Sequence, residues 1–355
     1  MFRPLWAAVI ALVLGALTQP RSPAACPACA CGQPWAGVYP TVLTPWNCDG
    51  TVDEASLEAQ LRYEMAGGVH GVLMLGSLGE GERASMEARA QVLAVTARTV
   101  AGCVPFLVGI HTCDLDCARA QMLQAKEAGA AAVLVKYKGC PHASGCQVLA
   151  FYQALSESAP LPIFYYHYPT DTDLKLSPAE IAAVVRLPNV AGVKFSTLDL
   201  REFEAVAAHA RGCGKVYFTA TALNLTQFMD AGGHGAMCPE AVLLPHKTVC
   251  VYKLWCDGRR DAAREAQKDL FVLSPVFRGG FTTEQMARKK VMFTQDHDIR
   301  LPMQDYEPQA RLKATLNCLG VPTSSRVSCP LPGLTPRDER LVRQTAAKVR
   351  ERNLR

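Results

Sequence analysis

The sequence has no segment that is typical of a linker between domains. Its 23 prolines and 26 glycines are scattered as turn residues, and no Ser-rich or like-charge block separates two halves. The 355 residues, 49% of them hydrophobic, are enough to bury a large core. We therefore predict one large α/β domain rather than two ordinary domains.

The excess of one sign of charge over the other is also small. Charged residues make up 19% of the chain, the net charge is +5, and much of the excess lies in a predicted last helix after Arg337. A Lys/Arg-rich helix of this kind is usually a solvated face. The composition therefore gives little reason to expect binding to nucleic acid or to a membrane surface.

A long apolar run occurs at the amino terminus, from Leu5 to Leu17, after Met1-Phe2-Arg3 and before Ala24-Ala25. This order is typical of a secretory signal peptide. We predict a signal peptide over residues 1–25, a Cys-rich connecting segment over 26–36 and a single domain over 37–355. The protein would be secreted if the signal is used and cytoplasmic otherwise, and the sequence leaves both alternatives open.

Cysteine is abundant, with 15 residues, but its pattern defines no framework. Cys26, Cys29 and Cys31 lie close together without a fourth ligand that we can identify, so we predict no metal site there. Cys113 and Cys117 fall within one predicted helix, and no disulfide framework is evident.

From Gly37 onward, short apolar segments alternate with longer amphipathic ones. This alternation predicts helices over 53–65, 83–100, 113–128 and 147–158, with a further helix capped by Ser177 before Pro178. It also predicts eight strands, over 37–43, 71–75, 105–110, 132–135, 163–166, 190–195, 216–219 and 235–237. Repeated strand-helix units with apolar strands imply a parallel sheet, and eight of them favour a closed (β/α)8 TIM barrel with additional C-terminal helices.

Lys194 stands near the carboxyl end of the sixth predicted strand, among apolar neighbours such as Val193 and Phe195. A lysine amine condenses with a ketone only when it is deprotonated, and burial promotes that form. Lowering a lysine pKa from about 10.4 to about 7 takes roughly 4 to 5 kcal/mol, which desolvation can supply. Lys194 is therefore a candidate Schiff-base former, although a salt bridge at the rim of a barrel is the structural alternative.

The fifth predicted strand ends in Tyr165-Tyr166-His167-Tyr168-Pro169. If the strands are parallel and consecutive, Tyr166 lies on the same face as Lys194 and can move a proton for a ketone bound there. Residues alternate in direction along a strand, so Tyr165 points away from Tyr166. An aromatic-rich barrel core is the alternative interpretation, and His167 is expected to be a hydrogen-bonded residue rather than a base.

The second predicted strand is followed by Gly76-Ser77-Leu78-Gly79-Glu80. The glycines permit a tight path with exposed amides, and Ser77 adds a hydroxyl, so the turn can hold a small carboxylate. A carboxylate site beside a Schiff-base lysine suggests a 2-keto acid, while an ordinary strand-helix connection is the alternative. The turn lacks the glycine spacing and the following lysine of a phosphate-binding loop.

Together these segments resemble the class I aldolases grouped with dihydrodipicolinate synthase and N-acetylneuraminate lyase, over roughly residues 37–315. The run Thr41-Val42-Leu43-Thr44-Pro45 shares in the resemblance, and the tyrosine and lysine motifs look most like those of animal-type N-acetylneuraminate (sialic acid) lyases. The resemblance implies a pyruvate imine on Lys194, Tyr166 as proton shuttle and a homotetramer. It implies no metal and no diffusible cofactor.

The chain departs from the pattern of this family where substrates are recognised. Leu78 replaces a second hydroxyl residue and offers only its amide, and Ala222 and Leu223 stand where a sialic acid lyase carries an acidic residue. Glu240 could supply a displaced carboxylate. Each lost polar partner costs about 1 to 3 kcal/mol, so use of that sugar acid could be abolished.

The synthase branch is no better supported by the sequence. It would want a second tyrosine after the fourth strand and an arginine beyond Pro169, whereas Asp171 and Asp173 follow here. These carboxylates would repel a dicarboxylic acceptor, unless Lys136 or Lys138 compensates.

The expected reaction is cleavage of an N-acetylneuraminate-like 2-keto-3-deoxy sugar acid to pyruvate and an aldehyde, by a carbon-carbon lyase. Lys194 would attack the keto carbon, Ser77 and the Leu78 amide would hold the carboxylate, and Ser196 would contact the substrate beside the imine. A synthase-like condensation, or another 2-keto acid aldolase, is the first alternative. A ligand-binding barrel without turnover is an alternative of a different class.

Overall fold

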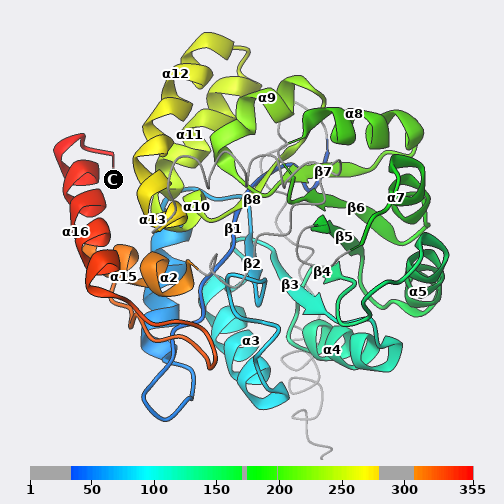
Figure 1. Ribbon diagram of the computed structural model, residues 1–355, viewed down its shortest axis with the longest axis horizontal. Coiled ribbons are helices and arrows are strands. Elements are labelled where there is room, and N and C mark those ends of the chain that lie inside the picture. The colour runs from blue at the N-terminus through cyan, green and yellow to red at the C-terminus, as the bar shows by residue number, and fades with distance from the viewer. Residues whose placement is uncertain (1–32, 170–173, 198, 280–307, 355) are drawn as a thin grey trace, which may run out of the picture.

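The computed structural model describes residues 33–169, 174–197, 199–279 and 308–354. The predicted signal peptide, the cluster of Cys26, Cys29 and Cys31, and the acidic pair Asp171 and Asp173 lie outside the described residues. Strands surround a central axis and helices surround the strands (Figure 1).

The core of the molecule is an eight-stranded parallel barrel. The strand order is β1-β8-β7-β6-β5-β4-β3-β2, and a parallel bridge between Thr41 and Leu73 joins β1 to β2. The predicted TIM barrel is therefore confirmed. The strands are β1 (Gly37–Pro40), β2 (Val72–Met74), β3 (Phe106–His111), β4 (Ala132–Lys136), β5 (Ile163–His167), β6 (Val190–Phe195), β7 (Val216–Thr219) and β8 (Gly235–Cys238).

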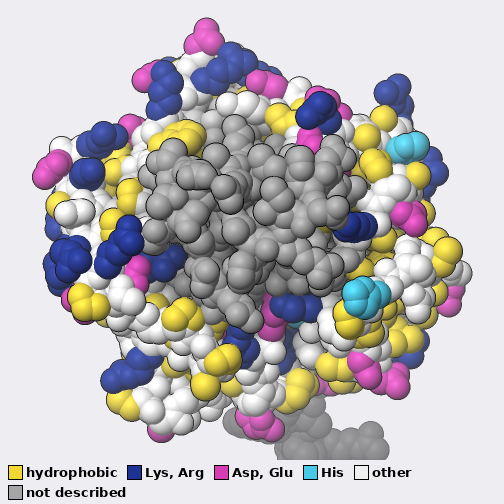
Figure 2. Space-filling model, in the orientation of Figure 1, with side chains coloured by type: hydrophobic (Ala, Val, Ile, Leu, Met, Phe, Trp, Pro, Cys, Tyr) yellow, Lys and Arg dark blue, Asp and Glu magenta, His cyan; other side chains and the backbone are white. Residues whose placement is uncertain are grey.

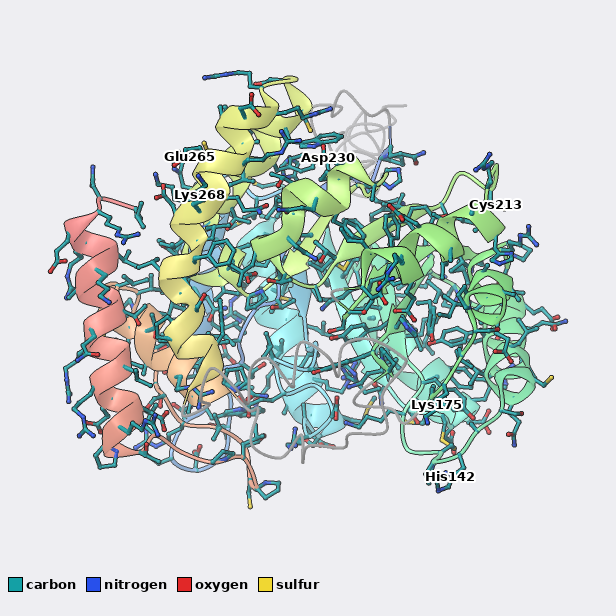
Figure 3. The ribbon with its side chains drawn as sticks, turned by 45° about the horizontal axis from the view of Figure 1, so that its top comes forward. His142, Lys175, Cys213, Asp230, Glu265 and Lys268 are labelled. Carbon is teal, nitrogen blue, oxygen red and sulfur yellow. A yellow bond between two sulfur atoms is a disulfide. The ribbon has the colours of Figure 1, made fainter. Side chains whose placement is uncertain are left out.

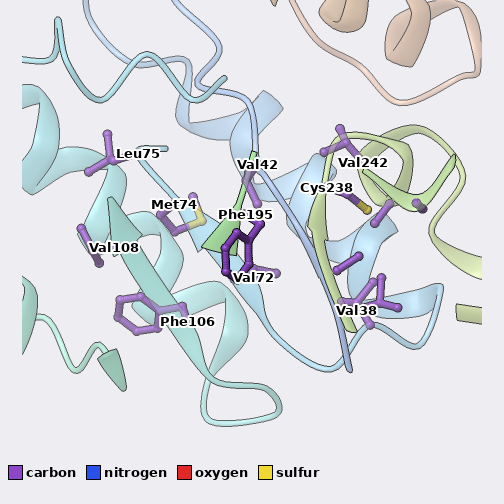
Figure 4. Packing of buried hydrophobic residues seen from close by; sticks show 14 of the residues in the cluster. Val38, Val42, Val72, Met74, Leu75, Phe106, Val108, Phe195, Cys238 and Val242 are labelled. Carbon is purple, nitrogen blue, oxygen red and sulfur yellow. The ribbon is translucent and has the colours of Figure 1, made fainter. Parts of the chain in front are cut away.

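Alternation along the strands separates two apolar cores. Side chains such as Leu134, Phe164 and Phe218 form a cluster that fills the barrel interior, and the Phe164 and Phe218 rings lie 5.7 Å apart. The intervening strand residues, among them Val108 and Phe195, belong to a larger cluster between strands and helices (Figure 4). The aromatic-rich barrel core is thus present, and Tyr166 is part of it.

A layer of helices covers the barrel (Figure 1). The helices are α2 (Glu54–Ala66), α3 (Met86–Val100), α4 (Leu115–Glu127), α5 (Gly145–Ser158), α7 (Pro178–Val185), α8 (Leu200–His209), α9 (Leu225–Asp230), α10 (Glu240–Leu243), α11 (Pro245–Cys256), α12 (Arg260–Leu270), α13 (Ser274–Arg278), α15 (Gln309–Cys318) and α16 (Pro336–Glu351), with short 3-10 turns η1 (Ala222–Asn224) and η2 (Phe271–Leu273).

Capping side chains explain where several of these helices begin. Asp53 accepts a hydrogen bond from the Ser56 amide and starts α2, close to the predicted position. The predicted start at Arg83 is wrong, because Ser85 caps α3 and the preceding residues form a turn. Ser177 caps α7 before Pro178, as predicted.

The C-terminal helices α15 and α16 pack together outside the barrel, beside α2 and α13 in Figure 1. A buried ion pair connects them to the segment after β2, because the Lys313 ammonium on α15 donates to Glu80 Oε1 over 2.5 Å. The other oxygen of Glu80 accepts from Trp46 Nε1 and from the Ser328 amide. Glu80 is therefore a structural residue that joins the loop to the C-terminal helices.

Among the cysteines that the structure describes, one disulfide, Cys113–Cys140, links the segments that follow β3 and β4. The sequence showed no disulfide framework, and this pair is one that its pattern did not reveal. The placement of Cys113 and Cys117 in one helix is wrong, since Asp114 caps α4 and leaves Cys113 outside it. The two cysteines are far apart in sequence and meet because β3 and β4 are parallel neighbours.

The surface carries both signs of charge. The face drawn in Figure 2 shows Lys and Arg side chains as well as Asp and Glu side chains, mixed with hydrophobic ones. Figure 3 shows Glu265 and Lys268 on the outer helix α12, where they pair over 2.5 Å. Among the described helices, none is long and apolar enough to cross a membrane.

Candidate active site

Lys194 lies near the carboxyl end of β6 with 4% of its surface exposed. The residue beside it in the sheet is Tyr166 of β5, and the two are direct register partners. The Lys194 ammonium nitrogen lies 4.4 Å from the centroid of the Tyr166 ring. The predicted amine and phenol are therefore brought together at the carboxyl end of the barrel.

The charge state of Lys194 follows from its surroundings. Burial lowers its pKa to about 7, against the opposing influence of Cys238 and Glu240 and with the help of the nearby Lys136 ammonium. A large fraction of the amine is then neutral at physiological pH. This is the form that attacks a carbonyl carbon.

Tyr166 and its neighbours divide between the two sides of the strand. Tyr166 and Tyr168 stack with ring centroids 5.6 Å apart; Tyr166 belongs to the interior cluster and Tyr168 packs against it. Tyr165 points outward, where its hydroxyl meets His167 Nδ1 at 3.2 Å, and His167 Nε2 meets Glu202 at 3.1 Å. His167 is thus a buried hydrogen-bonded residue away from the interior, in agreement with the prediction.

The turn after β2 has a fixed and crowded path. Glu80 and Gly81 donate their amides back to Ser77 and Gly76, which closes the turn. A Cβ atom at Gly81 would lie 1.9 Å from the Leu75 carbonyl oxygen, so glycine is required there. Ser77 is half-buried, and its hydroxyl contacts Glu82 Oε1 at 3.4 Å.

The remaining predicted residues have different positions. Leu78 and Leu223 are half-buried and pack against the outer apolar cluster, and Ala222 is fully buried within it. Ser196 follows β6 directly, is half-buried, and donates its amide to the His167 carbonyl. Ser77 and Ser196 therefore follow the ends of β2 and β6, while the side chains of Leu78, Ala222 and Leu223 serve the core.

Glu240 is already engaged by the segment in which the sequence lacks an acidic residue. Its two carboxylate oxygens accept from the Thr221 hydroxyl at 2.6 Å and from the Ala222 amide at 3.0 Å. Burial raises the pKa of Glu240, and these hydrogen bonds oppose that rise. Both oxygens hold the segment after β7, so the contacts of Glu240 are those of a structural residue.

Lys136 lies beside Ser77 and Glu82, in contacts that the sequence did not reveal. It is fully buried at the carboxyl end of β4 and forms an ion pair with Glu82 Oε1. Its ammonium group also donates to the Ser77 hydroxyl over 3.1 Å and lies 5.7 Å from the centroid of the Tyr166 ring. The signal that could have found it is the inward alternation of Leu134 and Lys136 along β4.

Glu82 connects Lys136 to two further groups. Lys138 donates to Glu82 Oε2 over 2.5 Å, and His111 Nδ1 lies 3.6 Å from Glu82 Oε1. Burial would raise the pKa of the Glu82 carboxyl, but His111, Lys136 and Lys138 hold it well below its usual range. Glu82 is therefore ionised at neutral pH.

His111 is neutral at this place, since burial and Lys136 lower its pKa to about 3. Its Nε2 atom lies 3.0 Å from the Leu75 carbonyl oxygen, which can only accept, so Nε2 carries the proton.

Ser77, Glu82, Lys136, Lys138 and His111 together are called the Lys136 cluster below. Within the described residues, no group of His, Cys, Asp and Glu side chains has the arrangement of a metal site.

Comparison with known proteins identifies the family. Residues 34–318 match the model of the dihydrodipicolinate synthetase family. A 4-hydroxy-tetrahydrodipicolinate synthase from Phenylobacterium zucineum is 30% identical over 62% of this chain and 75% of its own length. A synthase of the same name from Methanospirillum hungatei is 28% identical over 79% of this chain and 98% of its own length.

Solved structures share the fold. A dihydrodipicolinate synthase from Thermotoga maritima superposes with a TM-score of 0.77 at 21% identity, covering 90% of this chain and 99% of that chain. YagE, a prophage protein of this family from Escherichia coli determined in complex with pyruvate, gives a TM-score of 0.76 at 21% identity, with the same coverage.

The predicted family is confirmed, and these relatives bear the synthase name rather than that of a sialic acid lyase. Enzymes of this family are pyruvate-dependent class I aldolases that form a Schiff base on a lysine and need no external cofactor. The chain belongs to the dihydrodipicolinate synthetase family and is a carbon-carbon lyase of the class I aldolase type.

Proposed function

We propose that Lys194 forms an imine with pyruvate and that the enzyme joins this three-carbon unit to an aldehyde. The observation that carries the proposal is the buried Lys194 amine, 4.4 Å from the Tyr166 ring centroid at the carboxyl end of neighbouring strands. Its pKa of about 7 makes the neutral amine abundant where the reaction would occur.

The chemistry uses one amine and one proton carrier. The Lys194 amine adds to the keto carbon, water leaves, and a protonated imine forms as the electron sink. Transfer of a methyl proton to Tyr166 gives an enamine, whose carbon attacks the aldehyde carbonyl as Tyr166 returns that proton to the developing alkoxide. Hydrolysis of the new imine releases the product and restores the amine.

Condensation is the direction that the names of the relatives favour. Every step is reversible, so the same residues could cleave a 2-keto-3-deoxy sugar acid to pyruvate and an aldehyde. The sialic acid substrate is the weaker candidate, because Ala222 and Leu223 pack into the core and Glu240 is engaged by Thr221. Both directions belong in the assay.

Intact-mass spectrometry after borohydride treatment with pyruvate tests the proposal. Hydride reduces the imine carbon and leaves a stable secondary amine on the lysine. We expect a pyruvate-sized adduct in the wild-type protein and none in Lys194→Ala, with both proteins folded by circular dichroism. A folded wild-type protein without an adduct would reject the imine chemistry and favour a ligand-binding barrel.

We further propose that the protein is secreted and matures in an oxidising compartment. The Cys113–Cys140 disulfide supports this, because disulfides persist mainly in secreted and periplasmic proteins. Mass spectrometry of the protein from its natural host, with and without reductant, tests it: an oxidised pair and an amino terminus near residue 26 are expected. A reduced pair and an intact Met1 would contradict it.

The homotetramer remains a prediction that size-exclusion chromatography with light scattering can check.

A further inference from the structure

We propose that Lys136 binds the carboxylate of the 2-keto acid and thereby determines the preference for acids over neutral ketones. The inference rests on the proposed imine at Lys194 and adds the group that orients the ligand. Lys136 is a binding residue in this proposal and takes no covalent part in the reaction.

The position of Lys136 is the first argument. It ends β4, next to β5, and its side chain points inward like that of Tyr166. Its ammonium group lies 5.7 and 5.5 Å from the ring centroids of Tyr166 and Tyr168. The cation is therefore held beside the same phenol that Lys194 approaches from β6.

The contact with Ser77 is the second argument. The Lys136 ammonium donates to the Ser77 hydroxyl over 3.1 Å, so the cation and this hydroxyl share one location. A carboxylate arriving there can accept from the ammonium with one oxygen and from the Ser77 hydroxyl with the other. Ser77 is the residue that the sequence already assigns to the carboxylate.

The side chain of Leu78 explains why a cation is useful here. Leu78 packs toward the outer apolar cluster and brings no hydroxyl to the turn. A charge-assisted hydrogen bond is about twice as strong as a neutral one, so one ammonium group can replace the missing hydroxyl. The loss at Leu78 and the gain at Lys136 concern the same ligand group.

Glu82 holds the cation in place without removing it from the site. The Glu82 carboxylate pairs with both Lys136 and Lys138, and its own side chain is 15% exposed. This pairing fixes the Lys136 ammonium at Ser77. The positive charge of Lys136 also disfavours the protonated form of Lys194, which agrees with its depressed pKa.

The test compares pyruvate with methyl pyruvate, an ester of similar shape that lacks the charge. Trapping rates with borohydride are measured for both ketones in wild type and in Lys136→Met combined with Glu82→Gln. The double variant avoids leaving the Glu82 carboxylate with only one of its two lysine partners. We expect trapping of pyruvate to fall about 10- to 100-fold and trapping of the ester to stay within about threefold.

Two further variants keep the test decisive. Lys136→Gln with Glu82→Gln retains polar groups and serves if the Met variant does not fold. Lys268→Met with Glu265→Gln removes an equal pair of charges on the outer helix α12 (Figure 3) and should leave both rates unchanged.

The outcomes separate this inference from the proposed function. An unchanged preference for pyruvate in the folded variant, or an equal fall for both ketones, would overturn the role of Lys136. Absence of any adduct with either ketone in wild type would instead reject the imine at Lys194. Loss of the preference for pyruvate alone supports the inference.

Discussion

Two glutamates on the same loop, Glu80 and Glu82, form ion pairs with lysines in different parts of the molecule. Glu80 and Lys313 have fully buried side chains, and the partners of Glu80 come from α15 and from segments outside the barrel interior. Glu82 pairs with Lys136 and Lys138, whose side chains are 0% and 31% exposed, beside Ser77. The residue types are alike, and the position of the lysine decides whether the pair joins the loop to the C-terminal helices or lies beside Ser77 and Tyr166.

The largest expected effect tests whether Tyr166 is the proton carrier beside Lys194. Tyr166→Phe removes the proton carrier but keeps the ring beside Lys194, so kcat should fall about 10²- to 10⁴-fold while the borohydride adduct still forms. Steady-state kinetics and adduct mass measure both. Tyr165→Phe is the matched control, because Tyr165 points outward to His167 and its loss should leave kcat within about twofold. A larger effect of Tyr165→Phe would break the comparison.

The next effect concerns the buried ion pair of Glu80 and Lys313. Lys313→Met leaves Glu80 buried without its cation, and we expect a loss of about 3 to 5 kcal/mol in the free energy of unfolding. Lys136→Met should cost less, about 1 to 3 kcal/mol, because Glu82 keeps Lys138 and some contact with water. Urea denaturation of both variants measures the difference. Equal losses would mean that the two pairs do not differ in this way.

Removing the Cys113–Cys140 disulfide should lower the free energy of unfolding somewhat less than Lys313→Met. Cys113 and Cys140 are 27 residues apart, and closing a loop of that size stabilises a protein by about 3.5 kcal/mol. Changing both cysteines to serine should lower the free energy of unfolding by about this amount and loosen the segment beside Lys138. Denaturation with and without reductant provides the check, since reductant should affect wild type and leave the double variant unchanged.

The smallest effect is a shift in pH dependence. Burial first, and then Cys238, Lys136 and Glu240, act on the Lys194 amine, whose pKa of about 7 means that trapping should fall about tenfold per pH unit below 7. Removing the positive charge in Lys136→Met favours protonated Lys194, so the midpoint should move upward by less than about one unit. Lys313→Met should not move it. Trapping rates from pH 5 to 9 measure the midpoints, and a downward shift for Lys136→Met would contradict the argument.

Local patterns were sufficient for the barrel. Periodicity placed all eight strands, because a parallel strand that is buried on both faces appears in the sequence as a short continuous apolar run. The same reasoning placed Lys194 and Tyr166 on one face, since both stand near the ends of consecutive strands. Helix starts were less accurate where a turn precedes the cap, as at Ser85.

Contacts across the barrel could not be predicted in this way. Glu82 and Lys136 are 54 residues apart, and nothing in either segment signals the other. Cys113 and Cys140 meet only because β3 and β4 are paired. Such partners depend on which strands lie next to one another in the sheet, so the sequence showed the Schiff-base candidate but not the residues around Lys136.

The crowding at the Leu75 carbonyl has a consequence for engineering. A Cβ atom at Gly81 or Gly109 would come within 2.3 Å of this oxygen, and the His111 ring donates to it. The loop after β2 and the middle of β3 therefore change shape together or not at all. A library built to retarget this aldolase should keep these two glycines and His111 constant and vary Leu78 and Lys138.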